Sequence, residues 1–340
     1  MNGHTKRIGA AAVFAGALAM GGVAEAQTKL RVVSTPPGTG PFSYLAAVAD
    51  MINKHADDVE AHVAGHGKAT RHYVDATRGN VDIFFSQPLY HVWMTKGQRI
   101  FAKVKNGPEV ANKASALFAI NVAIFHFITR EDSGIRELSD LKGRKVYLGP
   151  PGGGATFITT RTVQAATGLE AGKDFEVLKV GWNAGFQAFQ DRQIDVVARG
   201  NLLPAAAIQQ LVLTSKLRFL GIPKSKLEAP SVVNFLKMPG VTVAVIPKGI
   251  YGKNHTNETG VTTTSVWGQV GIRTDIDANV VYKITKAFWE HIDEVHRKSV
   301  GFKDLTLANA FRETASPIHP GAVKYYREIG VEVPERLLHK

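Results

Sequence analysis

The most specific chemistry in the 340-residue sequence lies in a glycine-rich loop. The segment GPPGGGAT, Gly149 to Thr156, follows the β-rich run KVYLG and precedes a helix-period segment. Glycine lets backbone N–H groups approach a ligand closely, and a helix N-terminus adds unpaired donors and a partial positive charge. A strand-to-helix turn that touches no ligand is the alternative. The loop predicts an anion contact made by Gly152, Gly153, Gly154, Ala155 and Thr156.

The same loop lacks the sequence of a nucleotide-binding phosphate loop. Ala155 and Thr156 stand where a Lys followed by Ser or Thr would bind nucleotide phosphates and Mg²⁺. The sequence also has no G-x-S-x-G elbow, no H-E-x-x-H and no obvious paired carboxylates at strand ends. We therefore expect no catalytic residue, no cofactor, and a protein that binds its ligand without reacting with it.

Other candidate residues follow β-rich runs, and ligands of open α/β sheets bind at the carboxyl ends of strands. Trp182 would stack on a ligand or pack in a core. Arg199 would bind a carboxylate of the ligand or form a structural salt bridge, and Asn201 follows it closely. Earlier candidates lie at a turn, a helix start and a third strand end: Thr39, Gly40, Ser43, Lys68, Arg71, Ser86 and Gln87. For Lys68 and Arg71, solvated surface charge is the alternative.

Four histidines within one short window raise the question of a metal site: His55, His62, His66 and His72. His62 and His66 lie four residues apart around the end of a β-rich run. In a strand that spacing spans roughly 13 Å, too far for a shared ion unless the turn at Gly65 folds them together. We expect no metal site.

The N-terminus has the pattern of an export signal. Lys6 and Arg7 precede an apolar stretch, which ends in Ala24-Glu25-Ala26, a small-x-small cleavage pattern. This predicts a signal peptide over residues 1–26, a mature chain beginning near Gln27 and a periplasmic location. A membrane anchor is the alternative, but the stretch of about 16 residues is short for a span that needs about 20.

The composition narrows the classes of partner. With no Cys, the chain has no disulfide, thiolate metal site or cysteine nucleophile. A net charge of +12 favours an anionic partner, such as a carboxylate ligand, lipid headgroups or nucleic acid. Nucleic acid fits worst, because Lys and Arg are dispersed and no ladder of aromatic and basic residues occurs. We expect a small organic anion as ligand and a monomeric protein.

Strands and helices alternate along the chain, which predicts an α/β fold with parallel sheets. The expected elements include a strand EVLKVG (176–181), a helix that begins at Pro204, and a long helix N-capped by Asp277 that runs to Val295. Two long β-rich segments, Leu117 to Arg130 and Thr263 to Arg273, enclose a second α/β unit and could each bridge two domains. A domain inserted through two crossing strands is the architecture of a clamp that closes about a hinge. We predict a discontinuous domain I (residues 27–124 and 270–340), an inserted domain II (residues 125–269), and a ligand cleft between them.

The mature chain resembles the TAXI-type solute receptors of TRAP transporters over nearly its whole length. The segments that carry the resemblance are SGIRELSDLKGRKVYLGPPGGGAT (133–156), RQIDVVARGNLLPAAAI (192–208), IPKGIYG (246–252), VVYKITKAFWEHID (280–293) and SPIHPGAVKYYREIG (316–330). The resemblance implies a type II periplasmic binding protein fold with two crossing hinge strands. It also implies a small carboxylate or dicarboxylate ligand, for example an amino acid such as glutamate, and delivery to an ion-coupled TRAP-type permease.

The sequence departs from that family's pattern in the first domain. It reads Gly-Thr-Gly-Pro-Phe-Ser from Gly38 where members usually have G-T-G-G-T-Y-Y, and Ser86-Gln87-Pro88 where a Gln-Ser-Asp run is common. Arg71 stands at the usual Asn. Our hypothesis is that the second domain still holds a carboxylate, while Arg71 reads a second acid group. A receptor for an ATP-driven importer and a basic protein that adheres to anionic polymers are the alternatives.

Overall fold

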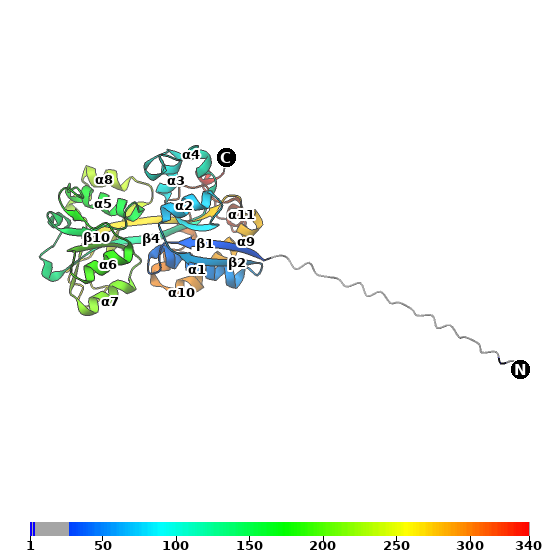
Figure 1. The fold of residues 1–340 in the computed structure, drawn as a ribbon, viewed down its shortest axis with the longest axis horizontal. Helices are drawn as coiled ribbons and strands as arrows, with labels where there is room; N and C mark the ends of the chain where they lie inside the picture. Colours follow the sequence, from blue (N-terminus) through cyan, green and yellow to red (C-terminus); the bar gives the residue numbers. More distant parts are fainter. Residues whose placement is uncertain (2, 4–26, 340) are drawn as a thin grey trace.

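The computed structural model describes residues 1, 3 and 27–339. Apart from Met1 and Gly3, the predicted signal peptide lies outside the described residues. Two lobes lie side by side along the long axis of the molecule, and two long strands cross between them (Figure 1). These strands are β4 (Ala114–Arg130) and β10 (Val261–Arg273).

Each lobe alternates strands with covering helices. Lobe I carries β1 (Thr28–Ser34), α1 (Gly40–His55), β2 (Val59–Gly65), α2 (Ala69–Thr77), β3 (Ile83–Ser86), α3 (Pro88–Thr95), α4 (Gly107–Ala111), α9 (Ala278–Glu290), α10 (Ile292–Lys298) and α11 (Pro320–Glu328). Lobe II carries β5 (Lys145–Tyr147), α5 (Gly154–Thr167), β6 (Glu176–Val177), α6 (Trp182–Gln190), β7 (Val196–Asn201), α7 (Ala206–Thr214), β8 (Leu217–Leu220), α8 (Pro230–Leu236) and β9 (Val241–Ile246).

The strand order confirms the predicted fold class. The sheet runs β2-β1-β3-β10-β4-β7-β5-β6, with β8 against β4 and β9 against β10. Strand β1 pairs in parallel with β2 and β3, whereas β10 is antiparallel to β3 and to β4. The long antiparallel pair β4–β10 connects a parallel sheet in each lobe. This is the two-domain α/β fold of type II periplasmic binding proteins.

The hydrophobic cores follow the lobes. One cluster contains buried residues from Leu30 to Ala123 and from Val270 to Leu337, and two further clusters draw on residues from Phe125 to Val266. Nearly all of β4 is buried, which explains its almost unbroken apolar sequence. The boundaries at 124/125 and 269/270 stay a prediction, because both crossing strands run through both lobes.

Several predicted elements differ in detail. The helix expected to begin at Pro204 begins at Ala206, and the expected strand EVLKVG is ordered as a strand only at Glu176–Val177. The long helix after Asp277 is interrupted at His291 and forms α9 and α10. Asp277 is the predicted N-cap, and its carboxylate accepts from the backbone N–H groups of Asn279 and Val280.

Candidate functional site

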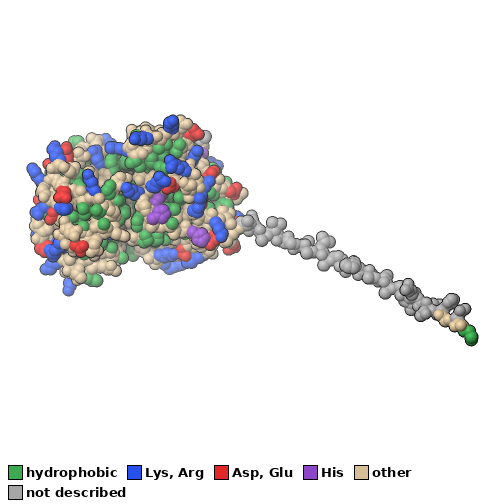
Figure 2. Space-filling view, viewed as in Figure 1, with side chains coloured by type: hydrophobic (Ala, Val, Ile, Leu, Met, Phe, Trp, Pro, Cys, Tyr) green, Lys and Arg blue, Asp and Glu red, His purple; other side chains and the backbone are tan. Residues whose placement is uncertain are grey.

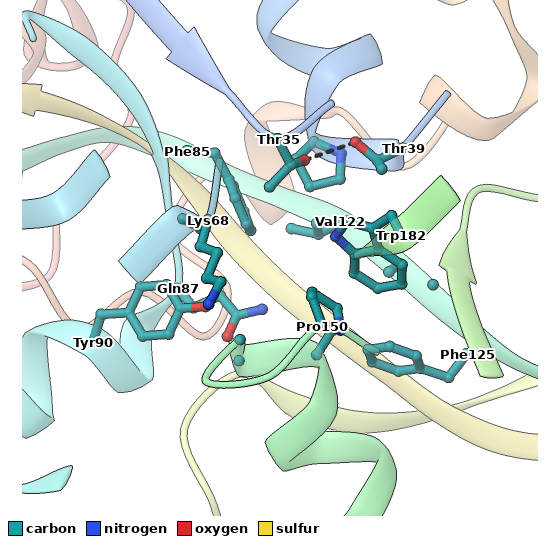
Figure 3. Close-up of a pocket in the computed structure, with 17 residues that line it drawn as sticks. Thr35, Thr39, Lys68, Phe85, Gln87, Tyr90, Val122, Phe125, Pro150 and Trp182 are labelled. Carbon is teal, nitrogen blue, oxygen red and sulfur yellow. Dashed lines mark hydrogen bonds between the residues drawn. The ribbon is translucent and has the colours of Figure 1, made fainter. Parts of the chain in front are cut away.

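A small cavity lies where the two lobes meet (Figure 3). Its volume is about 60 Å³, room for roughly four to six water-sized groups. Residues of both lobes and of the crossing strand β4 surround it. The polar or aromatic residues around it are Thr35, Thr39, Lys68, Phe85, Gln87 and Tyr90 of lobe I, Phe125 of β4, and Trp182 of lobe II. Lobe II also contributes Pro150, Gly153, Gly154 and Ala155, and β4 contributes Val122.

A tight turn after β1 presents two hydroxyls to the cavity. The Oγ1 atoms of Thr35 and Thr39 lie 2.7 Å apart, and Thr39 Oγ1 also donates to the carbonyl of Pro36 at 2.8 Å (Figure 3). Gly38 between them has a φ of +82°, which an L side chain rarely adopts. The turn therefore holds both threonines at the edge of lobe I that lines the cavity.

Lys68 reaches across from lobe I to lobe II. It is the N-cap residue of α2, and its ammonium donates to the carbonyl of Pro151 in the glycine-rich loop. Figure 3 shows its side chain extended toward Gln87 and Tyr90. Arg71, one turn along the same helix, is exposed and its Nε donates to Asp75 at 3.0 Å. The structure therefore brings Lys68 to the cavity and leaves Arg71 on the surface.

The start of α5 meets lobe I directly. The backbone of Gly154 lies against two side chains of lobe I: a Cβ on Gly154 would lie 2.2 Å from the Tyr90 hydroxyl oxygen and 2.9 Å from Gln87 Oε1. Burial raises the pKa of Tyr90, so the hydroxyl stays protonated at neutral pH. Thr156 Oγ1 donates to Pro150 at 2.7 Å and closes the loop on itself. A side chain of lobe I thus lies against the start of α5, where we expected a ligand to lie.

Aromatic contacts close the outer edge of the cleft. Phe157 of α5 packs edge to face on Trp93 of α3, with ring centroids 5.1 Å apart. The guanidinium of Arg99 lies 5.0 Å from the centroid of the Phe157 ring. A groove here is also lined by Gly152 and Thr156. The two predicted residues therefore lie on the outer side of the loop.

A second cavity of about 530 Å³ opens between α1 and the start of α7. It shares Thr39 with the first cavity and contains three further predicted residues, Gly40, Ser43 and Asn201. Gly40 has a structural role as well, because a Cβ there would lie 2.1 Å from the carbonyl oxygen of Val122. The interlobe cleft therefore continues past Thr39 toward α7.

Arg199 of β7 is buried, with 7% of its surface exposed, and its guanidinium lies 4.6 Å from the centroid of the Phe186 ring. Burial lowers the pKa of Arg199. None of the ion pairs among the described residues includes it, so the predicted alternative of a structural salt bridge is not formed there. A Cβ on Gly38 of lobe I would lie 3.7 Å from its Nη2. Arg199 thus faces the seam between the lobes.

The structure sorts the fifteen predicted residues by place. Seven line the first cavity: Thr39, Lys68, Gln87, Gly153, Gly154, Ala155 and Trp182. Ser86 is fully buried beneath the cavity and does not line it. Ten further lining residues were not predicted: Thr35, Pro41, Ala69, Phe85, Tyr90, Val122, Ala123, Phe125, Pro150 and Gly200. Thr35 directly follows β1, so the rule that ligands bind at strand ends could have found it.

The surface agrees with the absence of a basic stripe in the sequence. Figure 2 shows Lys and Arg side chains scattered over the visible face, with Asp and Glu between them. Within residues 27–339, no group of three His, Cys, Asp or Glu side chains is placed to hold a metal ion. His62 Nε2 pairs instead with Glu60 at 2.9 Å. No helix of the described chain has the length and hydropathy of a membrane span.

Comparison with known proteins identifies a matching family and similar solved structures. A family model described as the NMT1-like family matches residues 34–330. Among solved structures, the chain is similar to the alkanesulfonate-binding protein SsuA from Xanthomonas axonopodis pv. citri bound to MOPS, at 12% identity, 92% and 96% coverage of the two chains and a TM-score of 0.48. It is also similar to a TRAP periplasmic solute-binding protein from Ralstonia eutropha with bound (S)-2-acetolactate, at 11% identity, 90% and 86% coverage and a TM-score of 0.46. Similarity at this level assigns no ligand.

Proposed function

The chain belongs to the NMT1-like family, and from that premise we propose that it is a periplasmic solute-binding protein that captures a small organic anion by closure of its two lobes. It performs no chemistry on the solute and delivers it to a membrane transporter. Binding residues of both lobes surround one cavity, so the solute contacts both lobes at once, and such contacts shift a two-state equilibrium toward the closed form.

The make-up of the cavity carries this proposal. Of the 17 residues that line it, all within the described chain, none is acidic, and Lys68 is the one ionisable cation. The Gln87 amide and the Trp182 indole add groups that can donate hydrogen bonds, and the two threonine hydroxyls add polar surface. Such a lining favours an acceptor-rich or anionic group over a cation.

The apolar walls of the cavity limit which solutes can bind with useful affinity. Phe85, Phe125 and Trp182 offer apolar surface, worth roughly 25 cal/mol for each Å² that a ligand buries. One charge-assisted hydrogen bond adds about 1.5–3 kcal/mol. Micromolar affinity needs about 8 kcal/mol, so a short carboxylate with several hydrogen bonds and an apolar remainder fits. A carboxylate or dicarboxylate is the solute class that we propose.

We propose a TRAP-type ion-coupled permease as the partner, since the TAXI resemblance favours it. An ATP-driven importer is the alternative. The test is uptake of the bound solute by cells that make the protein. Uptake that stops when the ion gradient is dissipated at constant ATP supports the permease, and uptake that continues favours the importer.

The solute class is tested by a thermal-shift screen of the protein from Gln27 onward. The protein is first unfolded and refolded to remove any carried-over ligand, then tested with short carboxylic acids, their amides, amino acids and sugars. A melting temperature that rises with the concentration of one acid and not of its amide is the expected result, since ligand that binds only the folded state stabilises it by mass action. A response to neutral sugars alone would contradict the anion proposal.

A further inference from the structure

Three buried polar side chains of lobe II have donor atoms without a partner in the described chain. They are Arg199 at Nε, Tyr147 at its hydroxyl and Asn201 at Nδ2. The exposed fractions of the three residues are 7%, 1% and 4%. Buried polar groups are nearly always paired, so three unpaired donors in one region mark a place built for an acceptor.

The three residues share one face of the lobe II sheet. Arg199 and Asn201 are two positions apart on β7, where side chains alternate, so both point to the same side. Tyr147 of β5 pairs in register with Val197, two positions before Arg199, and packs in the same core cluster as Val197. We call these three groups the three-donor site.

The three-donor site adjoins the interlobe cleft. Trp182, which lines the first cavity, meets Tyr147 edge-on with ring centroids 6.2 Å apart. Asn201 lines the second cavity, and Gly38 of lobe I lies over Arg199 Nη2. A group bound to the three donors would therefore touch both lobes.

A second buried arginine in lobe II shows how the fold satisfies a structural guanidinium. Arg130 has 8% of its surface exposed and stacks on Phe189 with 4.3 Å between guanidinium carbon and ring centroid, much as Arg199 stacks on Phe186. Arg130 Nη2, however, donates to the carbonyls of Phe189 and Gln190. Two arginines in matched surroundings thus differ in whether the protein itself supplies acceptors.

We propose that the three-donor site binds the anionic group of the solute, and that Arg199 is the residue that recognises the negative charge of that group. The proposal rests on the proposed function and locates its anion contact, which the sequence placed at the glycine-rich loop. That loop instead contacts Tyr90 and Lys68 of lobe I. All three groups are donors and one carries positive charge, a set suited to a carboxylate or sulfonate.

The test compares Arg199→Met with Arg130→Met in the protein from Gln27 onward. The probes are sodium acetate and sodium methanesulfonate, with acetamide as the uncharged control, all at constant ionic strength. We expect at least one of the two anions to raise the melting temperature of the wild type and of Arg130→Met. In Arg199→Met its apparent dissociation constant should rise roughly 10- to 150-fold, the loss of a charge-assisted hydrogen bond.

A second readout separates binding from a structural role. Without added anion, Arg130→Met should melt below the wild type, whereas Arg199→Met should melt at the same temperature or higher, because a buried unpaired charge destabilises the fold. Equal responses of Arg199→Met and wild type to the anions would overturn the three-donor site and leave the proposed function standing. A lowered melting temperature of Arg199→Met, matching that of Arg130→Met, would overturn it as well. A wild type that responds to neither probe, nor to any acid of the wider screen, would overturn both.

Discussion

Trp93 of lobe I and Phe157 of lobe II meet edge to face across the mouth of the cleft, with their ring planes at 86°. The contact lies on α3 and α5, outside the cavity, and Arg99 lies against the same Phe157 ring. An aromatic pair in this geometry contributes about 0.5–1.5 kcal/mol beyond its buried area. It therefore stabilises the closed arrangement of the lobes independently of any solute.

Replacing Phe157 with Ala should shift the lobes toward the open form. Loss of about 0.5–1.5 kcal/mol corresponds to a closed-to-open ratio roughly 2- to 13-fold lower. Because the chain has no Cys, Lys105→Cys and Lys173→Cys place one dye on each lobe. Single-molecule energy transfer between the dyes measures the closed fraction.

Leu213→Ala is the control for this experiment. Leu213 is 78% exposed on α7, so its removal should leave the closed fraction unchanged. A Phe157→Ala protein with the same distribution of transfer efficiencies as Leu213→Ala would show that the aromatic pair does not hold the lobes together.

Gly154→Ala should block closure while leaving each lobe folded. The added methyl would lie 2.2 Å from the Tyr90 hydroxyl, and both atoms belong to well-packed segments of opposite lobes. The substitution removes a glycine from a helix terminus without disturbing its backbone conformation, so we expect a melting temperature close to that of the wild type. Calorimetric titration with an acid found by the thermal-shift screen should show at least tenfold weaker binding.

Gly181→Ala provides the matched control. Gly181 precedes α6 in lobe II, has a φ of −70°, and has no atom within 4 Å of an added Cβ. Its variant should bind the acid as the wild type does. Wild-type affinity in Gly154→Ala would mean that the bound form does not bring Tyr90 against α5.

The fold could be predicted from the sequence because its strands and helices have strong periodic patterns. The buried β4 reads as a long apolar run, and Asp277 marks the start of α9. The errors lie where tertiary packing overrides local pattern. The break at His291 is one: its ring stacks on His55 of α1 with centroids 3.4 Å apart, a contact that the helical period of residues 277–295 gives no sign of.

The candidate site could be predicted from the sequence only in part. Strand-end and glycine rules located Thr39, Lys68 and Trp182, since these depend on sequence position alone. They could not show that Tyr90 would meet Gly154, because that contact depends on how closely the two lobes approach. Nor could they separate Lys68 from Arg71, which lie on the same helix and differ in the direction that each side chain takes.

Lys68→Met should weaken acid binding about two- to fivefold, the range for a charge pair in contact with solvent. Arg71→Met, which removes a charge from the exposed Arg71–Asp75 pair, is the control and should leave affinity unchanged. The effect of Lys68→Met should also shrink at high ionic strength. If titrations instead show the larger loss in Arg71→Met, the original hypothesis that Arg71 reads an acid group is correct.

Stability should fall as the pH drops from 6.5 toward 4. Burial lowers the pKa of four histidines, His72, His91, His126 and His319, to about 4. Between pH 4 and 6.5 the unfolded chain therefore binds more protons than the folded one, so stability is full above 6.5 and is lost as the pH falls. These four histidines should contribute roughly three to four protons to the uptake on unfolding at pH 5.

Calorimetric unfolding at pH 5, in two buffers of different ionisation enthalpy, measures this proton uptake. His126→Gln keeps a side chain able to hydrogen-bond to the Ile124 carbonyl and the Tyr251 hydroxyl and should lower the uptake by about one proton. An uptake below one proton in the wild type would contradict the buried neutral state of these histidines.

The most direct test of the central claim is an energy-transfer titration of the Lys105→Cys, Lys173→Cys protein with a matched acid and amide. We predict that the acid closes the lobes along a single-site saturation curve and that the amide does so only at concentrations at least ten times higher. No acid-dependent closure, together with salt-sensitive binding to an anionic polymer such as heparin, would contradict a solute receptor and support a protein that adheres to anionic polymers.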